Sequence, residues 1–264
     1  MLKITSSANP KVKRAVDLRE LKNRKAMGLS LIEGEREILA ALEAGVDIQE
    51  LFVAEKYTNP SVVAIVKKCE RLTSEIFELS ANVFSKIAYG DKTEGLVAVG
   101  LIQQRQLEDL PKKSAALFLV IEGVEKPGNL GAILRSCDGA GVDGIIICDP
   151  ATDIYNPNTI RASLGAIFTT RVVVATNEAA AQFLKARKIK TIATSPAAQK
   201  PYWKLDAKGS VALVLGSEAK GLSPFWLKKA DEVLSIPMKG KLDSLNVSVS
   251  TAVILYDINR QRSS

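Results

Sequence analysis

Short apolar runs alternate with amphipathic or polar stretches along the whole chain. In the N-terminal part, strand-like runs lie at residues 29–32, 51–55, 75–80 and 95–102. Stretches with helical periodicity lie at residues 10–25, 35–45, 60–70 and 81–88. Asn9-Pro10 is typical of a helix start, because a capping side chain is followed by proline in the first turn. This alternation predicts a small α/β unit.

The pattern changes after a polar segment at 103–114, which lacks periodicity and is predicted to be a linker. Beyond it the apolar runs are short, continuous and bounded by Gly, Pro or Asp, as in parallel strands that are buried on both faces. These runs lie at residues 116–123, 144–149, 171–176, 190–195, 211–216 and 232–237. A largely apolar helix, opened by Ser244 as its cap, is expected to follow. We therefore expect an α/β protein with an N-terminal domain at 1–102 and a parallel-sheet domain at 115–264.

Ligands of open α/β sheets bind outside the carboxyl ends of the strands. The loops to inspect therefore follow Ile121, Ile147, Thr194, Leu215 and Ile236.

Two nucleotide-binding patterns are nearly present, and neither stands in the required context. Gly139, Gly141 and Gly144 have the spacing of a dinucleotide-binding loop, but they follow an expected helix and precede a strand, which reverses the order of that motif. Gly123 and Gly128 have the spacing of a P-loop, yet Asn and Leu follow where lysine and Ser/Thr would hold phosphate and magnesium. Helix termination and a tight turn explain the first pattern better, and the second is a weak indication of phosphate hydrolysis.

Composition excludes several kinds of chemistry. The chain of 264 residues contains no histidine, which removes Ser-His-Asp and Cys-His catalysis and zinc sites of the HExxH type. Its cysteines are Cys69, Cys137 and Cys148, an odd number without a CxxC pair. A disulfide framework is therefore not expected, and a reducing cytoplasm fits best.

Charge indicates the kind of partner. The formal net charge is +7, with a sequence pI of about 9.2, which favours a polyanion and nucleic acid before membrane. A signal-peptide core and a membrane-spanning run are not expected, so a soluble intracellular protein is predicted. Charge runs usually form a solvated face, but the positive balance favours RNA contact by the basic N-terminal helix. The candidate RNA-binding residues are Lys11, Arg14, Lys25 and Arg161.

Three segments at expected strand ends resemble the signature motifs of the SpoU (TrmH-type) branch of the SPOUT RNA methyltransferases. They read IEGVEKPGNLGAILRSC, LVLGSEAKGLS and IPMKGKLDSLNVSVSTAV, and DIYNPNTIRASLGAIF is similar to a further recurring segment of the family. The resemblance runs from about Leu117 to the last residue, and the N-terminal domain looks like the substrate-binding domain that many members carry. It implies a C-terminal parallel-sheet domain with a trefoil knot, which dimerises across the active-site region, and a smaller N-terminal α/β RNA-binding domain.

The resemblance also implies a function. Members transfer a methyl group from S-adenosylmethionine to a ribose 2′-hydroxyl of RNA, and this N-terminal domain favours large-subunit rRNA over tRNA. The implied catalytic residues are Asn129, Arg135, Glu218 and Asn246. The implied cofactor-binding residues are Thr194, Gly216, Ile236, Met238, Ser244 and Leu245. Ser217 departs from the family, which more often has Asn there, and we expect it to tune the cofactor loop.

The chemistry itself agrees with this interpretation. Methyl transfer from a sulfonium needs neither metal nor histidine, and it needs an oxygen nucleophile held in line at near-attack distance. An arginine is the base proposed in the family, but a guanidinium with a pKa above about 12 is a poor base. We therefore expect Arg135 to act first as a clamp on ribose and phosphate, and only second as the group that takes the proton.

Each residue has an ordinary structural explanation when it is taken alone. Asn129 and Ser244 could be helix caps, Glu218 and Arg135 could be surface charges, and Ile236 could be a core residue. A non-catalytic RNA-binding or ribosome-assembly factor, a tRNA methyltransferase and a nucleotide- or NAD-dependent enzyme therefore remain as alternatives. The order of the motifs at strand ends favours the rRNA methyltransferase.

Overall fold

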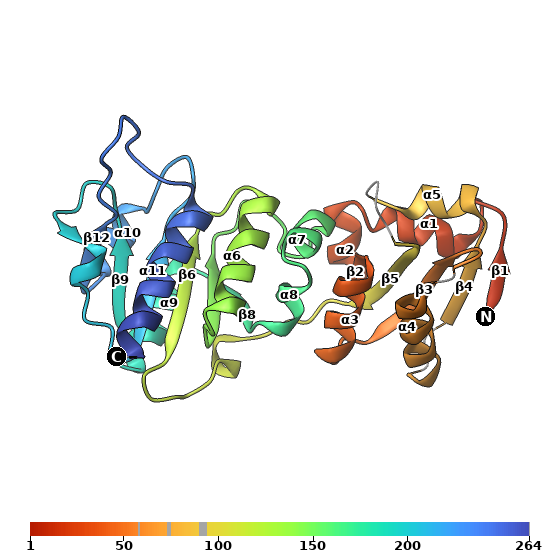
Figure 1. Cartoon of the computed structure of the whole chain (residues 1–264), viewed down its shortest axis with the longest axis horizontal. Helices are drawn as coiled ribbons and strands as arrows, with labels where there is room; N and C mark the ends of the chain where they lie inside the picture. The colour runs from red at the N-terminus through yellow and green to blue at the C-terminus, as the bar shows by residue number, and fades with distance from the viewer. Residues whose placement is uncertain (58, 73–74, 90–93, 264) are drawn as a thin grey trace. The chain divides into compact units, whose positions relative to one another are not determined.

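The computed structural model describes residues 1–57, 59–72, 75–89 and 94–263. The chain forms two compact units (Figure 1). Unit 1 consists of Met1–Gln103 and Asp153–Thr169, and unit 2 consists of Gln104–Thr152 and Thr170–Ser264.

Unit 1 contains a mixed five-stranded sheet with the order β1-β4-β3-β5-β2. β5 is antiparallel to β3 and β2, whereas β4 is parallel to β1 and β3. Phe52 and Phe77 stack on adjacent strands of its core, with ring centroids 5.5 Å apart. The strands are β1 (Leu2–Ile4), β2 (Leu29–Glu33), β3 (Ile48–Ala54), β4 (Glu75–Leu79) and β5 (Leu96–Leu101). The helices of the N-terminal segment are α1 (Pro10–Asp17), α2 (Leu21–Met27), α3 (Glu35–Glu43), α4 (Pro60–Arg71) and α5 (Ala81–Ile87).

The basic N-terminal stretch forms two helices rather than the single helix predicted over 10–25. Asn9 caps α1 as expected and accepts a hydrogen bond from the Lys11 amide at 2.9 Å. The chain turns after α1, and the guanidinium of Arg24 donates to the carbonyls of Leu18 and Arg19, each at 2.7 Å. Arg24 is nearly fully buried, so satisfying these carbonyls also satisfies its own donors.

Residues 153–169 pack in unit 1, although the sequence analysis placed them in the domain at 115–264. They form α7 (Pro157–Ala162), which packs on β2, and α8 (Ala166–Thr169), which packs on α3. The Arg24 Nε atom lies 2.6 Å from Asp153 Oδ2. A buried guanidinium needs a charged partner, and Asp153 supplies it from a distant part of the sequence.

Unit 2 contains a seven-stranded sheet with the order β10-β12-β9-β11-β6-β7-β8, in which all neighbouring strands of the described residues run parallel. Its strands are β6 (Leu117–Glu122), β7 (Gly144–Cys148), β8 (Val172–Ala175), β9 (Lys190–Thr194), β10 (Lys200–Pro201), β11 (Val211–Leu215) and β12 (Glu232–Ser235). Its helices are α6 (Pro127–Gly139), α9 (Asn177–Ala186), α10 (Pro224–Lys229) and α11 (Val247–Arg262), with 3-10 turns at Leu107–Asp109 and Tyr202–Lys204. The apolar runs predicted as buried parallel strands are confirmed, and only the two-residue β10 has no counterpart among them.

Helices cover both faces of this sheet. α6 and α11 pack against each other (Figure 1). α9 and α10 contribute Leu184 and Trp226 to a core cluster that includes the alternate β6 residues Phe118 and Val120. Successive side chains of a strand point to opposite faces, so this layering explains why the strands carry continuous apolar runs. Among the described residues, no helix is long and apolar enough to cross a bilayer.

The glycines after α6 end that helix, as the sequence analysis preferred. Gly141 has a left-handed φ of 67°, and the Val142 amide donates to the Cys137 carbonyl at 2.9 Å. This is the usual glycine-terminated helix end, and β7 begins at Gly144. The dinucleotide-binding interpretation of these glycines is therefore excluded by their structure.

Candidate active site

A pocket of about 540 Å³ opens in unit 2 at the carboxyl ends of β9, β11 and β12. Four segments form most of it: the loops after β9 and β11, the start of α6, and the loop that leads into α11. Parallel strands bring their carboxyl ends to one edge of the sheet, so loops that are distant in sequence meet there. Its lining residues include Lys126, Asn129, Thr194, Gly216, Glu218, Lys220, Ile236, Ser244, Leu245 and Asn246.

A chain of side-chain hydrogen bonds links three of these segments. Asn129 Nδ2 on α6 donates to Glu218 Oε1 at 2.5 Å. Asn246 Nδ2, at the start of α11, donates to Asn129 Oδ1 at 3.2 Å. Asn129 thus uses both ends of its amide and fixes the β11 loop relative to the α11 loop.

The capping interpretation of Asn129 is wrong. α6 begins at Pro127 with Lys126 as its N-cap residue, and no side chain caps it. Asn129 lies within the first turn, where its side chain is turned to Glu218. Capping therefore no longer explains this residue.

The cap of α11 is Asn246 rather than the predicted Ser244. Asn246 Oδ1 accepts hydrogen bonds from the Ser248 amide at 2.9 Å and from the Ser248 hydroxyl at 2.7 Å. Ser244 lies two residues earlier, exposed on the rim of the pocket. The amide of Asn246 is therefore held by the helix on one side and by Asn129 on the other.

One residue of the β11 loop leaves bonding capacity for a ligand, and another fixes the shape of that loop. Glu218 Oε2 is buried and has no hydrogen-bond partner among the described residues. A buried carboxylate oxygen without a donor is costly, so a ligand that donates to it would be favoured. Gly216 packs so closely that an added Cβ would lie 2.0 Å from the Gly221 carbonyl carbon, so the backbone of the β11 loop folds directly against it.

The pocket contains eight of the ten predicted catalytic and cofactor-binding residues. The exceptions are Arg135 and Met238, which do not line it. Arg135 is exposed on α6, two turns beyond the helix start, and no described residue is recorded as its hydrogen-bond or ion-pair partner. Met238 is half-buried in the loop after β12, two residues beyond Ile236.

The predicted RNA-binding residues lie in unit 1, and two of them have structural partners. Lys11 Nζ lies 2.8 Å from Glu50 Oε1, and Arg14 pairs with the same oxygen of this fully buried carboxylate. Hydrogen bonding to Glu50 raises the pKa of Lys11. Both cations therefore compensate a buried charge, whereas Lys25 is exposed on α2 and Arg161 is half-buried on α7.

Sequence reasoning missed a buried carboxylate that positions the pocket loop. Glu122, at the end of β6, accepts from the Ser223 amide and hydroxyl, both at 2.7 Å, and from Asn177 Nδ2 at 2.8 Å. Ser223 is the last residue of the loop that begins at Gly216, so its hydrogen bonds to Glu122 fix the end of that loop. Its position at a strand end was the available signal. The described residues contain no group of three or more His, Cys, Asp or Glu that could hold a metal.

Comparison with known proteins identifies a family for each part of the chain. The model of the SpoU rRNA Methylase family matches residues 116–256, and that of the MRM3-like substrate binding domain matches residues 9–98. The 23S rRNA (guanosine(2553)-2'-O)-methyltransferase RlmP of Bacillus subtilis is 30% identical over 258 residues, which cover 98% of this chain and 99% of that protein.

Solved structures of RNA methyltransferases are similar to this chain over nearly its full length. A crystal structure of an RNA 2'-O ribose methyltransferase is 38% identical, with a TM-score of 0.87 and 100% of both chains covered. An AdoMet-bound rRNA methyltransferase from Sinorhizobium meliloti is 28% identical, with a TM-score of 0.90 and 98% and 97% of the two chains covered. With the pocket at the strand ends and matches that span both units, the chain belongs to the SpoU rRNA methylase family.

Proposed function

We propose that this protein transfers a methyl group from S-adenosylmethionine to a ribose 2′-hydroxyl of large-subunit rRNA. The observation that carries the proposal is the bonded set Asn129–Glu218–Asn246 in a pocket at the strand ends. The B. subtilis relative, named for a 23S rRNA guanosine, supports rRNA over tRNA.

The pocket residues fit S-adenosylmethionine, which supplies an electrophilic methyl group on a sulfonium. Because Gly216 has no side chain, the backbone of the β11 loop packs closely against it. Glu218 Oε2, which has no hydrogen-bond partner among the described residues, would accept a hydrogen bond from the ligand. The pocket residues that would hold the cofactor are Thr194, Gly216, Ile236, Ser244 and Leu245, and Met238, which lies outside the pocket lining two residues beyond Ile236, would contact it from the same loop. Main-chain groups of the β11 and β12 loops would bind its polar edges, while Ile236 and Leu245 would contact its apolar surface.

The chain's own residues would position the nucleophile. Asn129 is hydrogen-bonded to both Glu218 and Asn246, so the three side chains would present a fixed polar surface to the ribose. Arg135 would clamp the ribose and the adjacent phosphate by charge-assisted hydrogen bonds, which a guanidinium can form bidentately. Its positive charge would stabilise the oxygen as the hydroxyl proton passes to water while the oxygen takes the methyl group.

We further propose a homodimer formed through unit 2, with Arg135 serving the pocket of the second copy. Arg135 lies outside the pocket of its own chain, and α11 carries the exposed apolar side chains Val249 and Tyr256. Large exposed apolar groups on one helix favour an interface. A trefoil knot in the parallel-sheet domain belongs to the same proposal, as does a cytoplasmic location, which the free cysteines favour.

A mixing experiment tests the shared site. Arg135→Ala and Glu218→Gln are each expected to be inactive, and mixed dimers would contain one pocket with both residues intact. Methyl transfer should then recover to about a quarter of the wild-type rate, because half of the dimers are mixed and each has one complete site. No recovery after subunit exchange would place Arg135 at its own chain's pocket.

The N-terminal domain at 1–102, joined by the linker at 103–114, would select the RNA. Lys25, and Arg161 from the segment Asp153–Thr169 of unit 1, would contact phosphates. Lys11 and Arg14, which pair with Glu50 and Glu75, would contribute through the donors that these carboxylates leave unused.

Mapping ribose methylation tests the function as a whole. RNA from cells with and without this protein is compared nucleotide by nucleotide, and one large-subunit rRNA ribose should lose its methyl group. If a tRNA ribose loses its methyl group instead, the substrate is tRNA rather than rRNA. No lost methyl group, together with no calorimetric binding of S-adenosylmethionine, would support a non-catalytic RNA-binding factor.

A further inference from the structure

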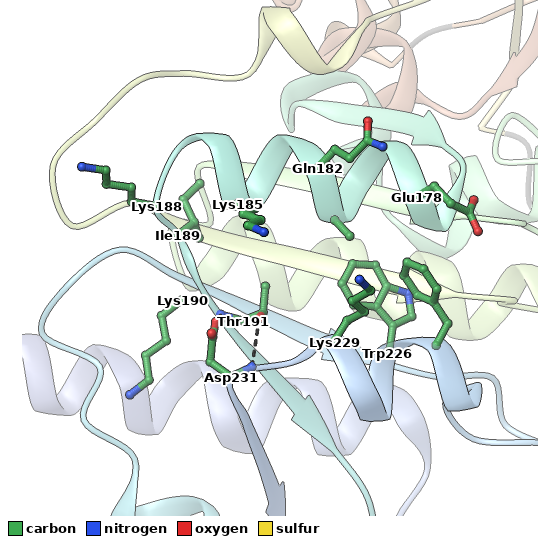
Figure 2. Close-up of a pocket in the computed structure, with 12 residues that line it drawn as sticks. Glu178, Gln182, Lys185, Lys188, Ile189, Lys190, Thr191, Trp226, Lys229 and Asp231 are labelled. Carbon is green, nitrogen blue, oxygen red and sulfur yellow. Dashed lines mark hydrogen bonds between the residues drawn. The ribbon is translucent and has the colours of Figure 1, made fainter.

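Unit 2 has a second and larger groove that is separate from the candidate active site. It has a volume of about 830 Å³ and lies between α9, α10 and the starts of β9 and β12 (Figure 2). Trp226, which is fully buried, and Thr191 form part of its wall. Figure 2 shows the side chains of Lys188 and Lys190 extending from the end of the groove where β9 begins.

The lining of this groove is basic. It includes four lysines but only one glutamate and one aspartate. Asp231 is already engaged, because its Oδ2 accepts from the Thr191 amide and hydroxyl, both at 2.7 Å. Lys190 is paired with Glu232 at 2.6 Å. The lining therefore carries a surplus of two positive charges, and in the part of the chain that the structure describes three of its exposed lysines form no ion pair: Lys185, Lys188 and Lys229.

Lys188 also occupies an unfavourable backbone conformation. Its φ is 54°, in the left-handed region, and it directly follows Arg187, the C-cap residue of α9. The Ile189 amide donates to the Leu184 carbonyl at 3.0 Å, the closing bond of a helix end that normally carries glycine or asparagine at the left-handed position. A lysine there costs conformational energy and places its charge beside the groove. Such strain is common where a side chain serves binding.

The groove and the active-site pocket lie at opposite ends of β9. Lys190 and Thr191 begin the strand and line the groove, whereas Thr194 ends it and lines the pocket. Five residues of strand span about 16 Å. An RNA that is bound in the pocket would therefore reach the groove only with nucleotides away from the methylated one.

We propose that this groove binds phosphodiester groups of the RNA substrate, outside the nucleotide that is methylated. The proposal rests on the proposed function for the identity of the polyanion. Lysines from α9, its cap and α10 lie around one groove, and Lys188 extends outward from its end (Figure 2), so phosphates that follow the rim of the groove would contact them. The groove would then add affinity for large RNA without reading its sequence.

A triple variant with a matched control tests the proposal. Lys185→Gln, Lys188→Asn and Lys229→Gln are combined in the full chain. The control combines Lys112→Gln, Lys204→Gln and Lys208→Asn, which removes the same charge from exposed positions of unit 2 outside the groove. Binding of radiolabelled large-subunit rRNA is measured at several salt concentrations between about 50 and 200 mM.

The groove variant should bind rRNA at least tenfold more weakly than the control. The magnitude of its slope of log affinity against log salt should be smaller than that of the control by about 2. Equal affinities and slopes for the two variants would overturn the proposal. Wild-type protein that binds rRNA but methylates none of it would refute the proposed function, and the comparison of slopes would still decide whether the groove binds RNA.

Lys188→Asn alone separates binding from a structural role. Asparagine tolerates the left-handed conformation, so the melting temperature should rise by about 1–3 °C. The affinity for rRNA should fall two- to fivefold, whereas Lys208→Asn should leave it unchanged. A variant that gains stability and keeps full RNA affinity would show that Lys188 has no part in binding.

Discussion

The close packing of Gly216 leads to a prediction that can be worked out from distances. In Gly216→Ala, the new Cβ would lie 2.0 Å from the Gly221 carbonyl carbon and 2.2 Å from the Leu222 amide nitrogen. Carbon atoms in contact are about 3.5–4.0 Å apart, so the β11 loop must move by more than about 1 Å. The atoms that clash are backbone atoms, so no side-chain rotation relieves the clash.

The expected effect is on both folding and cofactor affinity. Overpacking of this kind costs about 1–3 kcal/mol of stability. A displacement of about 1 Å in a loop that lines the pocket should weaken S-adenosylmethionine binding up to about 100-fold, or about 2.7 kcal/mol. Titration calorimetry gives the affinity, and thermal unfolding gives the stability.

Gly240→Ala is the matched control. Gly240 lies in the loop between β12 and α11, and a Cβ added there would have no atom within 4 Å. It should bind the cofactor like the wild type. If Gly216→Ala also bound S-adenosylmethionine with wild-type affinity and melted at the wild-type temperature, the role given to close packing at Gly216 would be refuted.

Three further predictions follow from single residues. Arg135→Ala should abolish methyl transfer and leave cofactor affinity nearly unchanged, because Arg135 lies outside the pocket of its own chain and is proposed to contact the ribose and phosphate rather than the cofactor; a normal rate of rRNA methylation would contradict its role. Hydrogen bonds from Lys190 and Lys200 lower the pKa of Glu232 below its usual 4.5, so Glu232 stabilises the fold above that pH and loses this effect as the pH falls further. Urea unfolding should therefore show Glu232→Gln destabilised at pH 7 and the difference shrinking below pH 4.5, whereas a constant difference would exclude the ion pairs as its cause. Burial raises the pKa of the Cys148 thiol to about 12, so native protein at pH 8 should react with a thiol reagent only as fast as it unfolds, and rapid labelling of Cys148 would contradict its burial.

Most strands could be predicted because they are buried apolar runs with a polar or glycine boundary. The strands β1 and β10 could not, since they have three and two residues, too few to carry a periodicity, and two of the three residues of β1 are exposed. The break between α1 and α2 was missed because it depends on Arg24, whose burial is set by tertiary packing. The position of residues 153–169 was missed for the same reason.

The candidate site was predictable as a set of residues and not as a set of contacts. Motif order identified Asn129, Glu218 and Asn246, but their hydrogen bonds join residues that are 89 and 117 positions apart. Ser244 and Asn246 are both good caps by type, and only the structure selects between them. The groove beside Lys188 was missed although three of its four lysines lie within residues 185–190, because the fourth, Lys229, joins them only through the packing of α10 against α9.

The packing of Asp153–Thr169 on unit 1 has a consequence for biosynthesis. A ribosome that emits the chain from its N-terminus delivers Arg24 long before its counter-ion Asp153, which follows 129 positions later. The five strands of unit 1 are complete by Leu101, but α7 and α8, which pack on it, follow only after Gln104–Thr152 of unit 2 has been translated, so unit 1 is completed after unit 2 has begun to emerge. For the same reason, exchange of unit 1 between genes would have to transfer two separated stretches of coding sequence.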